Sequence, residues 1–399
     1  MRQRLIYLLK HNLFVQKIYR VVMSSLFRLW GLFLATDDHL VLFVSFMGMG
    51  FNDSPKAIYD YMKAHPDYQE YQCVWAFEHP EKFTELETVK IDTLQYFRTA
   101  IKAKYWITNT NIERGLKFKK KDQKYLNTWH GIALKHIGND CPGRKDYNFD
   151  TVDYLVVSGK HDETVWKSAF NANEKTYLRC GMSRNEELWL ADENKKQDLR
   201  RKLKIPDGKK VILYAPTWRE STDGGRSYEI KPPIHFDMWK ERLGEDYIVL
   251  FRAHHQTTKV LGVQYDEFVW DASDYPAVND LMIASDLLIT DYSAIAFDYA
   301  ILGKPIFCYA YDYETYLAER GTYFSIDNYY PNKSCREEGE LLSRIEQMDY
   351  EAECRNTMRF RDDFIQYGKS AAAECVSALF TDSTRKPDVN KYSMVGDRN

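Results

Sequence analysis

Five polar residues follow short apolar runs in this chain, where they could perform acid–base or phosphate chemistry. They are His130, Arg252, His254, Asp291 and Ser293. A histidine, with an ordinary pKa of ~6.5, can act as a general base near neutral pH. An arginine and a helix N-terminus can together hold a diphosphate and stabilise the charge on a departing phosphate. The set therefore indicates transfer from an activated nucleotide donor to a hydroxyl group.

The stretch of residues 285–305 contains two of these positions. The apolar run 287–289 predicts a central strand buried on both faces, and the polar residues 290–293 then precede the small apolar run 294–302. A strand that turns tightly into a helix directs free backbone N–H groups out of the carboxyl edge of the sheet, which suits a phosphate. The same pattern also fits an α/β unit that is capped only for stability.

His130 ends a predicted strand at residues 126–129 and is followed by Gly131. A single histidine is more often structural than catalytic, but a glycine beside it allows close approach of a substrate or a neighbouring loop. Its place at a strand's carboxyl end favours a functional role. The glycines of residues 47–50 follow the first predicted strand without the spacing of a dinucleotide site, and are a candidate acceptor or phosphate contact.

Short apolar strands alternate with helices along the chain, which predicts parallel sheets covered by helices. A turn at residues 206–208 separates two such series, so we expect an α/β protein with two Rossmann-like domains that face each other across a cleft. The expected units are residues 39–190 and 191–380, followed by a polar tail at 381–399. Polar residues from both series would then lie on opposite walls of one cleft.

Residues 1–38 form a separate cationic piece. Residues 1–36 contain six Lys or Arg and no Asp or Glu, whereas the rest of the chain carries 49 basic and 58 acidic residues. No uncharged run approaches the ~18–20 residues that a membrane span needs, and a signal peptide is rejected because no convincing cleavage site follows. The pattern predicts a pair of basic amphipathic helices on an anionic membrane surface. The alternative is a helix packed on the protein's own body.

The remaining composition is that of a soluble globular protein of 399 residues. Its seven cysteines are scattered and form no C-x-x-C pair, which argues for a reducing compartment and against a structural metal site. The basic run at residues 114–124 is interpreted first as a solvated loop. Its alternative is a contact for an anionic polymer or a lipid headgroup.

Five motifs in a fixed order resemble the CDP-glycerol glycerophosphotransferase family, which comprises the teichoic-acid primases and polymerases. They are NTWHGIALKHIGND, GMSRNEEL, VILYAPTWRE, LFRAHH and SDLLITDYSAIAFDYAILGKPIFCYAYD, within residues 127–312. The resemblance implies a fold of the glycosyltransferase-B type and peripheral attachment to the cytoplasmic face of the bacterial membrane. It also implies transfer of glycerol phosphate from CDP-glycerol to a lipid-linked anionic polymer, with release of CMP and without nucleic acid. A homo-oligomer is compatible with these features.

The resemblance also assigns roles to individual residues. His130 matches the histidine of the W-H-G motif, which the family is thought to use as the base on the acceptor hydroxyl. His254 matches a second essential histidine, which we assign with Arg252 to the donor diphosphate, and the adjacent His255 is an alternative. The other donor-binding candidates are Asp291, Tyr292 and Ser293 in the diphosphate turn, Thr217 and Arg219 in the A-P-T-W-R loop, and Arg320 in the R-G-x-Y element.

Two departures from the family pattern bear on substrate contacts. Ala294 stands where a second serine is common, so phosphate contact there would depend more on backbone N–H groups. Ile132 and Ala133 replace a common Thr-Pro, which affects the acceptor side. The resemblance implies no cofactor beyond the donor substrate, and without an aspartate cluster a divalent metal stays undecided.

Three other interpretations stay open from the sequence. The donor could be CDP-ribitol, with teichoic acid or capsule as the acceptor, and primase and polymerase activities share these motifs. A nucleotide-sugar glycosyltransferase on the same fold would not need the W-H-G histidine. A non-catalytic scaffold on the membrane surface would retain its function after substitution of His130 and His254.

Overall fold

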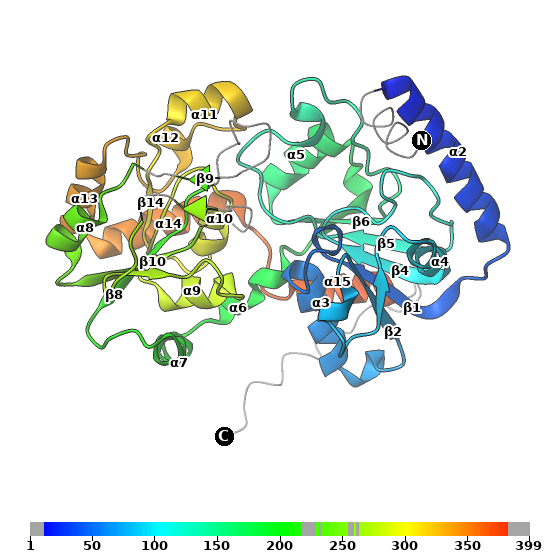
Figure 1. Ribbon diagram of the computed structural model, residues 1–399, viewed down its shortest axis with the longest axis horizontal. Coiled ribbons are helices and arrows are strands. Elements are labelled where there is room, and N and C mark those ends of the chain that lie inside the picture. Colours follow the sequence, from blue (N-terminus) through cyan, green and yellow to red (C-terminus); the bar gives the residue numbers. More distant parts are fainter. Residues whose placement is uncertain (1–11, 218–228, 231–232, 254–258, 261–262, 382–399) are drawn as a thin grey trace.

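A computed structural model describes residues 12–217, 229–230, 233–253, 259–260 and 263–381. The first domain contains a seven-stranded parallel sheet with the strand order β3-β2-β1-β4-β5-β6-β7 (Figure 1). Its strands are β1 (Asp37–Val44), β2 (Gln72–Phe77), β3 (Thr88–Lys90), β4 (Ala103–Thr108), β5 (Lys124–Asn127), β6 (Tyr154–Val157) and β7 (Tyr177–Arg179).

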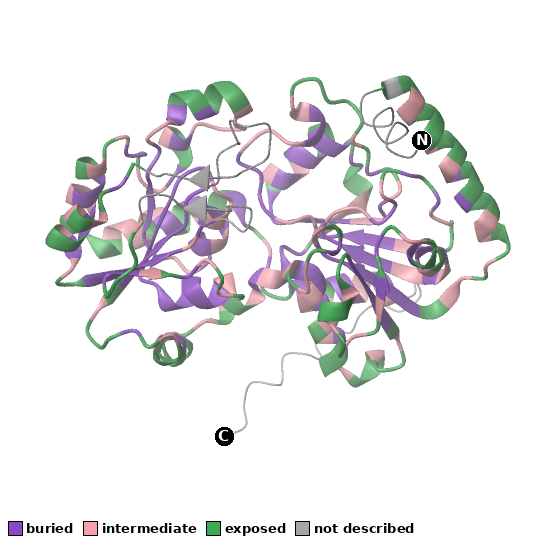
Figure 2. Cartoon of the chain, viewed as in Figure 1, coloured by how far each residue is buried: buried purple, intermediate pink, exposed green. Residues whose placement is uncertain are grey.

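Helices cover both faces of this sheet because alternate side chains of each buried strand are apolar on both sides. In β1, Val41 and Phe43 pack toward α3 (Asp53–Ala64), whereas Leu40, Leu42 and Val44 pack toward α4 (Leu94–Lys102) and α5 (Lys160–Phe170). The strands therefore lie in the interior, as the buried colouring in Figure 2 shows. Only their carboxyl ends and the loops that follow are available for chemistry.

The second domain contains a five-stranded parallel sheet with the order β12-β10-β8-β13-β14. The strand expected at residues 287–289 is β13, and it pairs on both edges, with β8 and β14. Helices α8 and α13 cover one face of the sheet, and α9, α10 and α14 cover the other. The elements are β8 (Lys210–Tyr214), β10 (Tyr247–Phe251), β12 (Val269–Asp271), β13 (Leu287–Thr290), β14 (Ile306–Cys308), α8 (Phe236–Leu243), α9 (Val278–Ala284), α10 (Ile295–Ala300), α11 (Tyr313–Arg320), α12 (Ile326–Tyr329), α13 (Glu338–Glu346) and α14 (Tyr350–Phe364), with a two-stranded pair of β9 (Glu229–Ile230) and β11 (Lys259–Val260).

The chain enters the second domain through the short helices after β7 and returns to the first domain at its end. The entry segment contains η6 (Ser183–Asn185), α6 (Glu186–Leu190) and α7 (Glu193–Leu203). The final helix α15 (Ala371–Phe380) packs beside α3 in the first domain (Figure 1). The sequence assigned residues 191–380 to one unit, and for residues 371–380 that assignment is corrected by the structure. These residues belong with the first domain because the apolar face of α15 packs against the first sheet and α3 in one buried core.

Of the two helices expected in the cationic head, the structure describes one, α2 (Leu13–Leu32). Residues 1–11 lie outside the described residues. Phe27 of α2 stacks on Phe97 of α4 with ring centroids 4.5 Å apart, and Ser24 Oγ accepts a hydrogen bond from Lys117 N. The opposite side of α2 is exposed along its length (Figure 2). Its large exposed apolar residues are Phe14, Ile18, Tyr19, Val21, Val22, Leu26, Leu29 and Leu32. Within the described residues, no helix is long and apolar enough to cross a membrane.

The first domain itself pairs three of the six positive charges in the basic run at residues 114–124 with carboxylates. Arg114 pairs with Asp92 at 2.8 Å, Lys117 with Asp150 at 2.6 Å, and Lys119 with Asp153 at 2.9 Å. The ammonium group of Lys120 donates to the carbonyl oxygen of Leu34, next to α2. These contacts favour a structural role for the run over a binding site for an anionic polymer.

Candidate active site

His130 lies in the loop after β5, and its ring orientation is set by one hydrogen bond. Its Nδ1 lies 2.8 Å from the carbonyl oxygen of Asn109, which can only accept a hydrogen bond. Nδ1 therefore carries the proton, and the lone pair of the neutral ring is on Nε2. The ring also lies against Trp129 and Phe46, with centroid distances of 4.1 and 5.5 Å. Burial lowers the pKa of His130, so the ring stays neutral at physiological pH.

Asparagines at the ends of two neighbouring strands hold this loop. Asn127 Oδ1 accepts from the backbone N–H of Trp129, which has a φ of 52°. Asn109 Oδ1 accepts from the backbone N–H of Phe46, so the loop after β1 is tied to the loop after β4. The 47–50 segment, a candidate acceptor contact from the sequence, lies directly after this Phe46. The carboxyl ends of β1, β4 and β5 thus converge on His130.

Gly131 brings the two domains into contact beside His130. A Cβ atom on Gly131 would lie 3.3 Å from the Cβ of Ala294 in the second domain and 3.7 Å from Nη2 of Arg184. Its φ of +148° is one that side chains rarely adopt. The W-H-G loop and the turn before α10, predicted separately from the sequence, are therefore neighbours at the domain boundary.

The turn before α10 is half-exposed at Ser293 and Ala294. Ser293 Oγ accepts a hydrogen bond of 3.3 Å from the backbone N–H of Ile295, the first residue of α10. The N-cap position itself is held by Ala294, which makes no side-chain cap hydrogen bond, so Ser293 lies one residue before the expected capping position. Helix α10 is shorter than the expected 294–302, because the chain turns out of the helix after Ala300. Through Ala294, this turn lies beside Gly131, the neighbour of His130 in the chain.

Asp291 and Thr217 lock two loops of the second domain together. Asp291 Oδ1 accepts from the backbone N–H groups of Thr217 and Tyr292, at 2.8 and 2.7 Å, and from Thr217 Oγ1 at 2.5 Å. Both residues are buried, with exposures of 2% for Asp291 and 7% for Thr217. Tyr292 is also 2% exposed, stacks on Tyr316 at 3.8 Å and donates to Asp312. These three residues hold together the loops that the sequence predicts to bind the donor, and their contact with a donor stays a prediction.

Arg252 follows β10, where Nη1 of its guanidinium donates to the carbonyl oxygens of Ala272 and Tyr275, at 2.8 and 2.7 Å. These bonds fix the position of the side chain near the carboxyl edge of the second sheet. Three further predicted residues, Arg219, His254 and His255, lie outside the described residues.

Arg320 ends α11, and the following Gly321 contacts the first domain. A Cβ on Gly321 would lie 2.6 Å from Nδ1 of His136, and the next residues bond to the loop after His130, with Tyr323 N donating to Leu134 O at 2.9 Å. An open pocket of about 520 Å³ lies beside this contact and is lined by His136, Lys145 and Tyr323 among others. The R-G-x-Y element therefore closes one side of the domain boundary.

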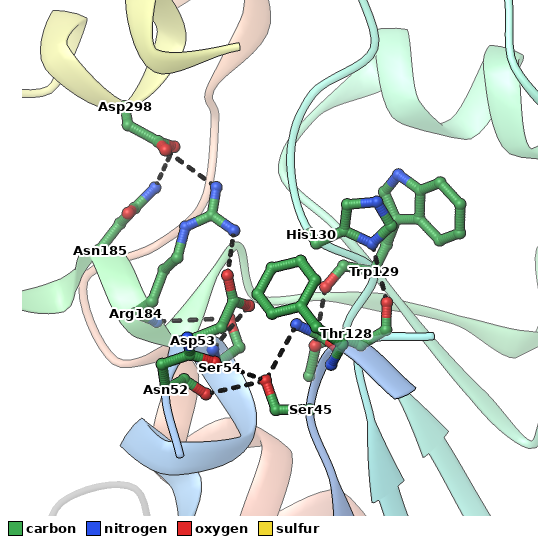
Figure 3. Close-up of polar contacts among 12 residues, drawn as sticks. Ser45, Asn52, Asp53, Ser54, Thr128, Trp129, His130, Arg184, Asn185 and Asp298 are labelled. Carbon is green, nitrogen blue, oxygen red and sulfur yellow. Dashed lines mark hydrogen bonds and ion pairs between the residues drawn. The ribbon is translucent and has the colours of Figure 1, made fainter. Parts of the chain in front are cut away.

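Arg184 lies in the motif GMSRNEEL, but its residue type and spacing predict no role for it. Its guanidinium binds Asp53 and Asp298, each at 2.8 Å, and lies beside the His130 loop (Figure 3). The signal was present as an arginine in a recognisable motif, but its partners are 131 and 114 residues away in the chain. Among the described residues, no group of His, Cys, Asp and Glu could hold a metal ion.

The family model described as CDP-Glycerol:Poly(glycerophosphate) glycerophosphotransferase matches residues 26–380. The chain belongs to this glycerophosphotransferase family. The two-domain fold of the glycosyltransferase-B type, expected from the resemblance, is confirmed by a solved relative. The wall teichoic acid polymerase TagF, in a histidine-to-asparagine variant soaked with CDPG, superimposes with a TM-score of 0.77 at 29% identity, over 92% of this chain and 95% of that one.

Several curated relatives of this chain are polymerases of teichoic acid. The chain is 34% identical over 332 residues to the teichoic acid poly(glycerol phosphate) polymerase of Staphylococcus epidermidis, covering 77% of this chain but 45% of that protein. It is 28% identical to the polymerase of the same name from Bacillus spizizenii, covering 92% of this chain and 97% of that one. A ribitol-phosphate polymerase of Staphylococcus aureus, TarL, is 31% identical over 273 residues, or 64% of this chain and 47% of that one. The chain thus spans about half of some relatives and nearly all of another.

Proposed function

We propose that this glycerophosphotransferase moves glycerol phosphate from CDP-glycerol to the terminal hydroxyl of a lipid-linked teichoic acid or related surface polymer, releasing CMP. The observation that carries the proposal is His130, whose Nδ1–H is held by Asn109 while Nε2 keeps its lone pair at the domain boundary. A neutral imidazole fixed in this tautomer is the arrangement that a general base needs. The membership of the family and its polymerase relatives support the choice of substrates.

In the proposed reaction, Nε2 of His130 takes the proton of the acceptor hydroxyl as its oxygen attacks the β-phosphorus of CDP-glycerol. The bond from that phosphorus to the oxygen bridging the two phosphates breaks, and CMP leaves with the bond electrons. Phosphoryl transfer depends mainly on positioning and charge stabilisation. The contact between the His130 loop and the Ser293–Ala294 turn supports an arrangement with the proposed base on one domain and the proposed phosphate site on the other.

We assign the donor to the second domain. The backbone N–H groups of the Ser293–Ala294 turn and the guanidinium of Arg252 would hold the diphosphate, together with His254. Asp291, Tyr292 and Thr217 support this wall through their mutual hydrogen bonds, and Arg219 and Arg320 complete the proposed donor set. The proposal includes no cofactor, and assays in Mg²⁺ and in EDTA decide whether a metal is required.

The test incubates the purified protein and a lipid-linked glycerol-phosphate acceptor with CDP-glycerol, CDP-ribitol or a UDP-sugar, and measures the released nucleotide. We expect CMP from CDP-glycerol, and a loss of at least 100-fold in His130→Ala, because general base catalysis contributes about 10²–10⁴-fold. His79→Ala is the matched control, since His79 is an exposed histidine paired with Glu81. CMP from CDP-ribitol alone would favour the ribitol-phosphate function suggested by the TarL relative, and UDP release would favour a glycosyltransferase.

We also propose that α2 attaches the protein to the cytoplasmic face of the membrane as a peripheral protein. Its exposed apolar side includes Phe14 at 72% and Val21 at 61% exposure, and the helix carries Lys17, Arg20 and Arg28 without an acid. Such a helix combines apolar insertion with attraction to anionic lipids, at about 1 kcal/mol per cation near the surface. The opposite side of α2 packs on α4 through Phe27 and Phe97, so α2 would hold the first domain in a fixed orientation on the membrane.

Flotation with vesicles tests this attachment. The wild-type protein should float with phosphatidylglycerol vesicles more than with phosphatidylcholine vesicles, and less at high salt. The double variant Val21→Asp and Leu29→Asp should lose most of this binding. Leu190→Asp, at a side chain that is 76% exposed on α6, is the control that should bind normally. Equal binding by all three proteins would refute the role of α2.

A further inference from the structure

Three charged side chains form a largely buried cluster at the domain boundary. Arg184 Nη1 lies 2.8 Å from Asp53 Oδ2, and Nη2 lies 2.8 Å from Asp298 Oδ2. The side chains of Arg184, Asp53 and Asp298 are only 15%, 8% and 14% exposed. Charges that are removed from water in this way are stable only while they stay paired. We call these three residues the boundary triad (Figure 3).

The triad joins three separate parts of the chain. Asp53 is the first residue of α3 in the first domain, Arg184 lies in the connecting helix η6, and Asp298 lies in α10 of the second domain. Asn185, next to Arg184, also donates to Asp298, at 2.6 Å. On the other side, Asn279 of α9 donates to the carbonyl oxygen of Arg184 at 2.7 Å. The arginine thereby connects α10 to the first domain through two ion pairs at opposite ends of one guanidinium.

The triad is adjacent to the proposed base. Nη2 of Arg184 would lie 3.7 Å from a Cβ on Gly131, the neighbour of His130, and Ala294 would lie 3.3 Å from the same atom. Ala294 precedes Asp298 by one helical turn, so the hold on Asp298 also places the start of α10. A change in the triad would therefore move the turn that faces His130.

We propose that Arg184 is a positioning residue for phosphoryl transfer, which holds the Ser293–Ala294 turn of the second domain against His130 by binding Asp53 and Asp298 together. The inference rests on the proposed function, in which His130 is the base and this turn contacts the donor phosphate. An arginine suits the task because its planar guanidinium binds two carboxylates from two directions, which a lysine ammonium on a flexible stem does less well.

The charges of the triad also act on His130 directly. Besides burial, which lowers its pKa, and the Asn109 carbonyl, which raises it, three charged groups face the ring. Asp53 from α3 raises the pKa of His130. Arg184 from η6 and Lys135, which lies in the same loop as His130, lower it. Any effect of Asp298 on the pKa of His130 is smaller than the effects of these groups. Neutralising Asp53 or Asp298 should therefore displace the Ser293–Ala294 turn in both cases. The two substitutions should differ in their effect on the pKa of His130.

The experiment compares Asp53→Asn, Asp298→Asn and Arg184→Lys by CMP release from CDP-glycerol across pH, with thermal unfolding to verify the fold. All three should lower kcat by about tenfold or more, because small displacements of reacting groups are costly. In Asp53→Asn, the acid limb of kcat/KM should also move to lower pH, since loss of a negative charge makes the imidazolium less favourable. In Asp298→Asn and Arg184→Lys the limb should stay in place, because Asp53 and a positive charge are retained.

Two results would overturn the inference in variants that fold. One is wild-type kcat in both Asp298→Asn and Arg184→Lys, and the other is an equal shift of the acid limb in the two asparagine variants. If Arg184→Lys alone fails to fold, the two asparagine variants test the inference. Each of them keeps one of the two ion pairs of Arg184. Failure of the proposed function is recognised separately, because the wild-type protein would then release no CMP from CDP-glycerol.

Discussion

Replacing Gly131 by alanine tests whether the contact between the domains positions the reaction. The new methyl group would lie 3.3 Å from the Cβ of Ala294, which is closer than ordinary contact, so one of the two loops must shift by a few tenths of an ångström. The φ of +148° adds backbone strain of about 1–3 kcal/mol for a residue other than glycine. Because a misplacement of about 1 Å can cost about 100-fold in rate, we expect kcat to fall about tenfold.

The assay for Gly131→Ala is CMP release together with thermal unfolding, and Gly143→Ala is its matched control. Gly143 lies in the same long loop and has a φ of +75°, but a Cβ there would meet nothing within 4 Å. The control should lose about 1–2 kcal/mol of stability from its positive φ and keep its activity. Full activity in a folded Gly131→Ala protein, or an equal loss of activity in both variants, would refute the reasoning.

Three further predictions concern pH and stability. Because burial lowers the pKa of His130, kcat/KM should be constant above pH 7 and fall only on the acid side of about 6.5, and a limb above pH 7 would contradict this. Burial also lowers the pKa of Lys304 to about 7, so above that pH the side chain is protonated in the unfolded chain but neutral in the folded protein. The folded state therefore gains stability as the pH rises, and the urea midpoint should increase from pH 7 to pH 8.5. This increase should be absent in Lys304→Met. Leu379→Ala in α15 should cost about 2–5 kcal/mol of stability because that side chain is 1% exposed in the first domain's core, whereas the exposed Glu374→Ala should have little effect in the same urea titration.

Much of the fold was predictable because its strands are short apolar runs with clear ends. The expected strand at residues 287–289 is β13 with one residue more, and the expected strand at 126–129 overlaps β5. Strands β3 and β7 were not expected, because they are the edge strands of the first sheet and no apolar run marks them: Val89 is the one buried residue of β3, and β7 has none. The place of α15 was also missed, since its apolar face fits either domain and only packing selects the first.

The candidate site was predictable in part for the same reason. His130 and Ser293 follow strands, and the carboxyl ends of parallel strands meet at one edge of a sheet, so their position at the domain boundary could be foreseen. Asp291 and Tyr292 were expected beside the donor, but both residues are buried, and their described contacts are with neighbouring segments of the second domain. A turn motif does not reveal which of its side chains face outward, because that depends on the loops that pack against it.

The amino-acid sequence by itself determined the alternation of strands and helices, the cationic amphipathic head and the histidine beside a glycine. These are local features, written in the types and spacing of neighbouring residues. The tertiary structure alone decided the tautomer of His130, the contact of Gly131 with Ala294 and the binding of Arg184 to two carboxylates. Each of these joins residues that are far apart in the chain. The contact of His130 with Asn109 needs β4 and β5 to pair in the first sheet, and the contacts of Gly131 with Ala294 and of Arg184 with Asp298 need the two domains to pack together.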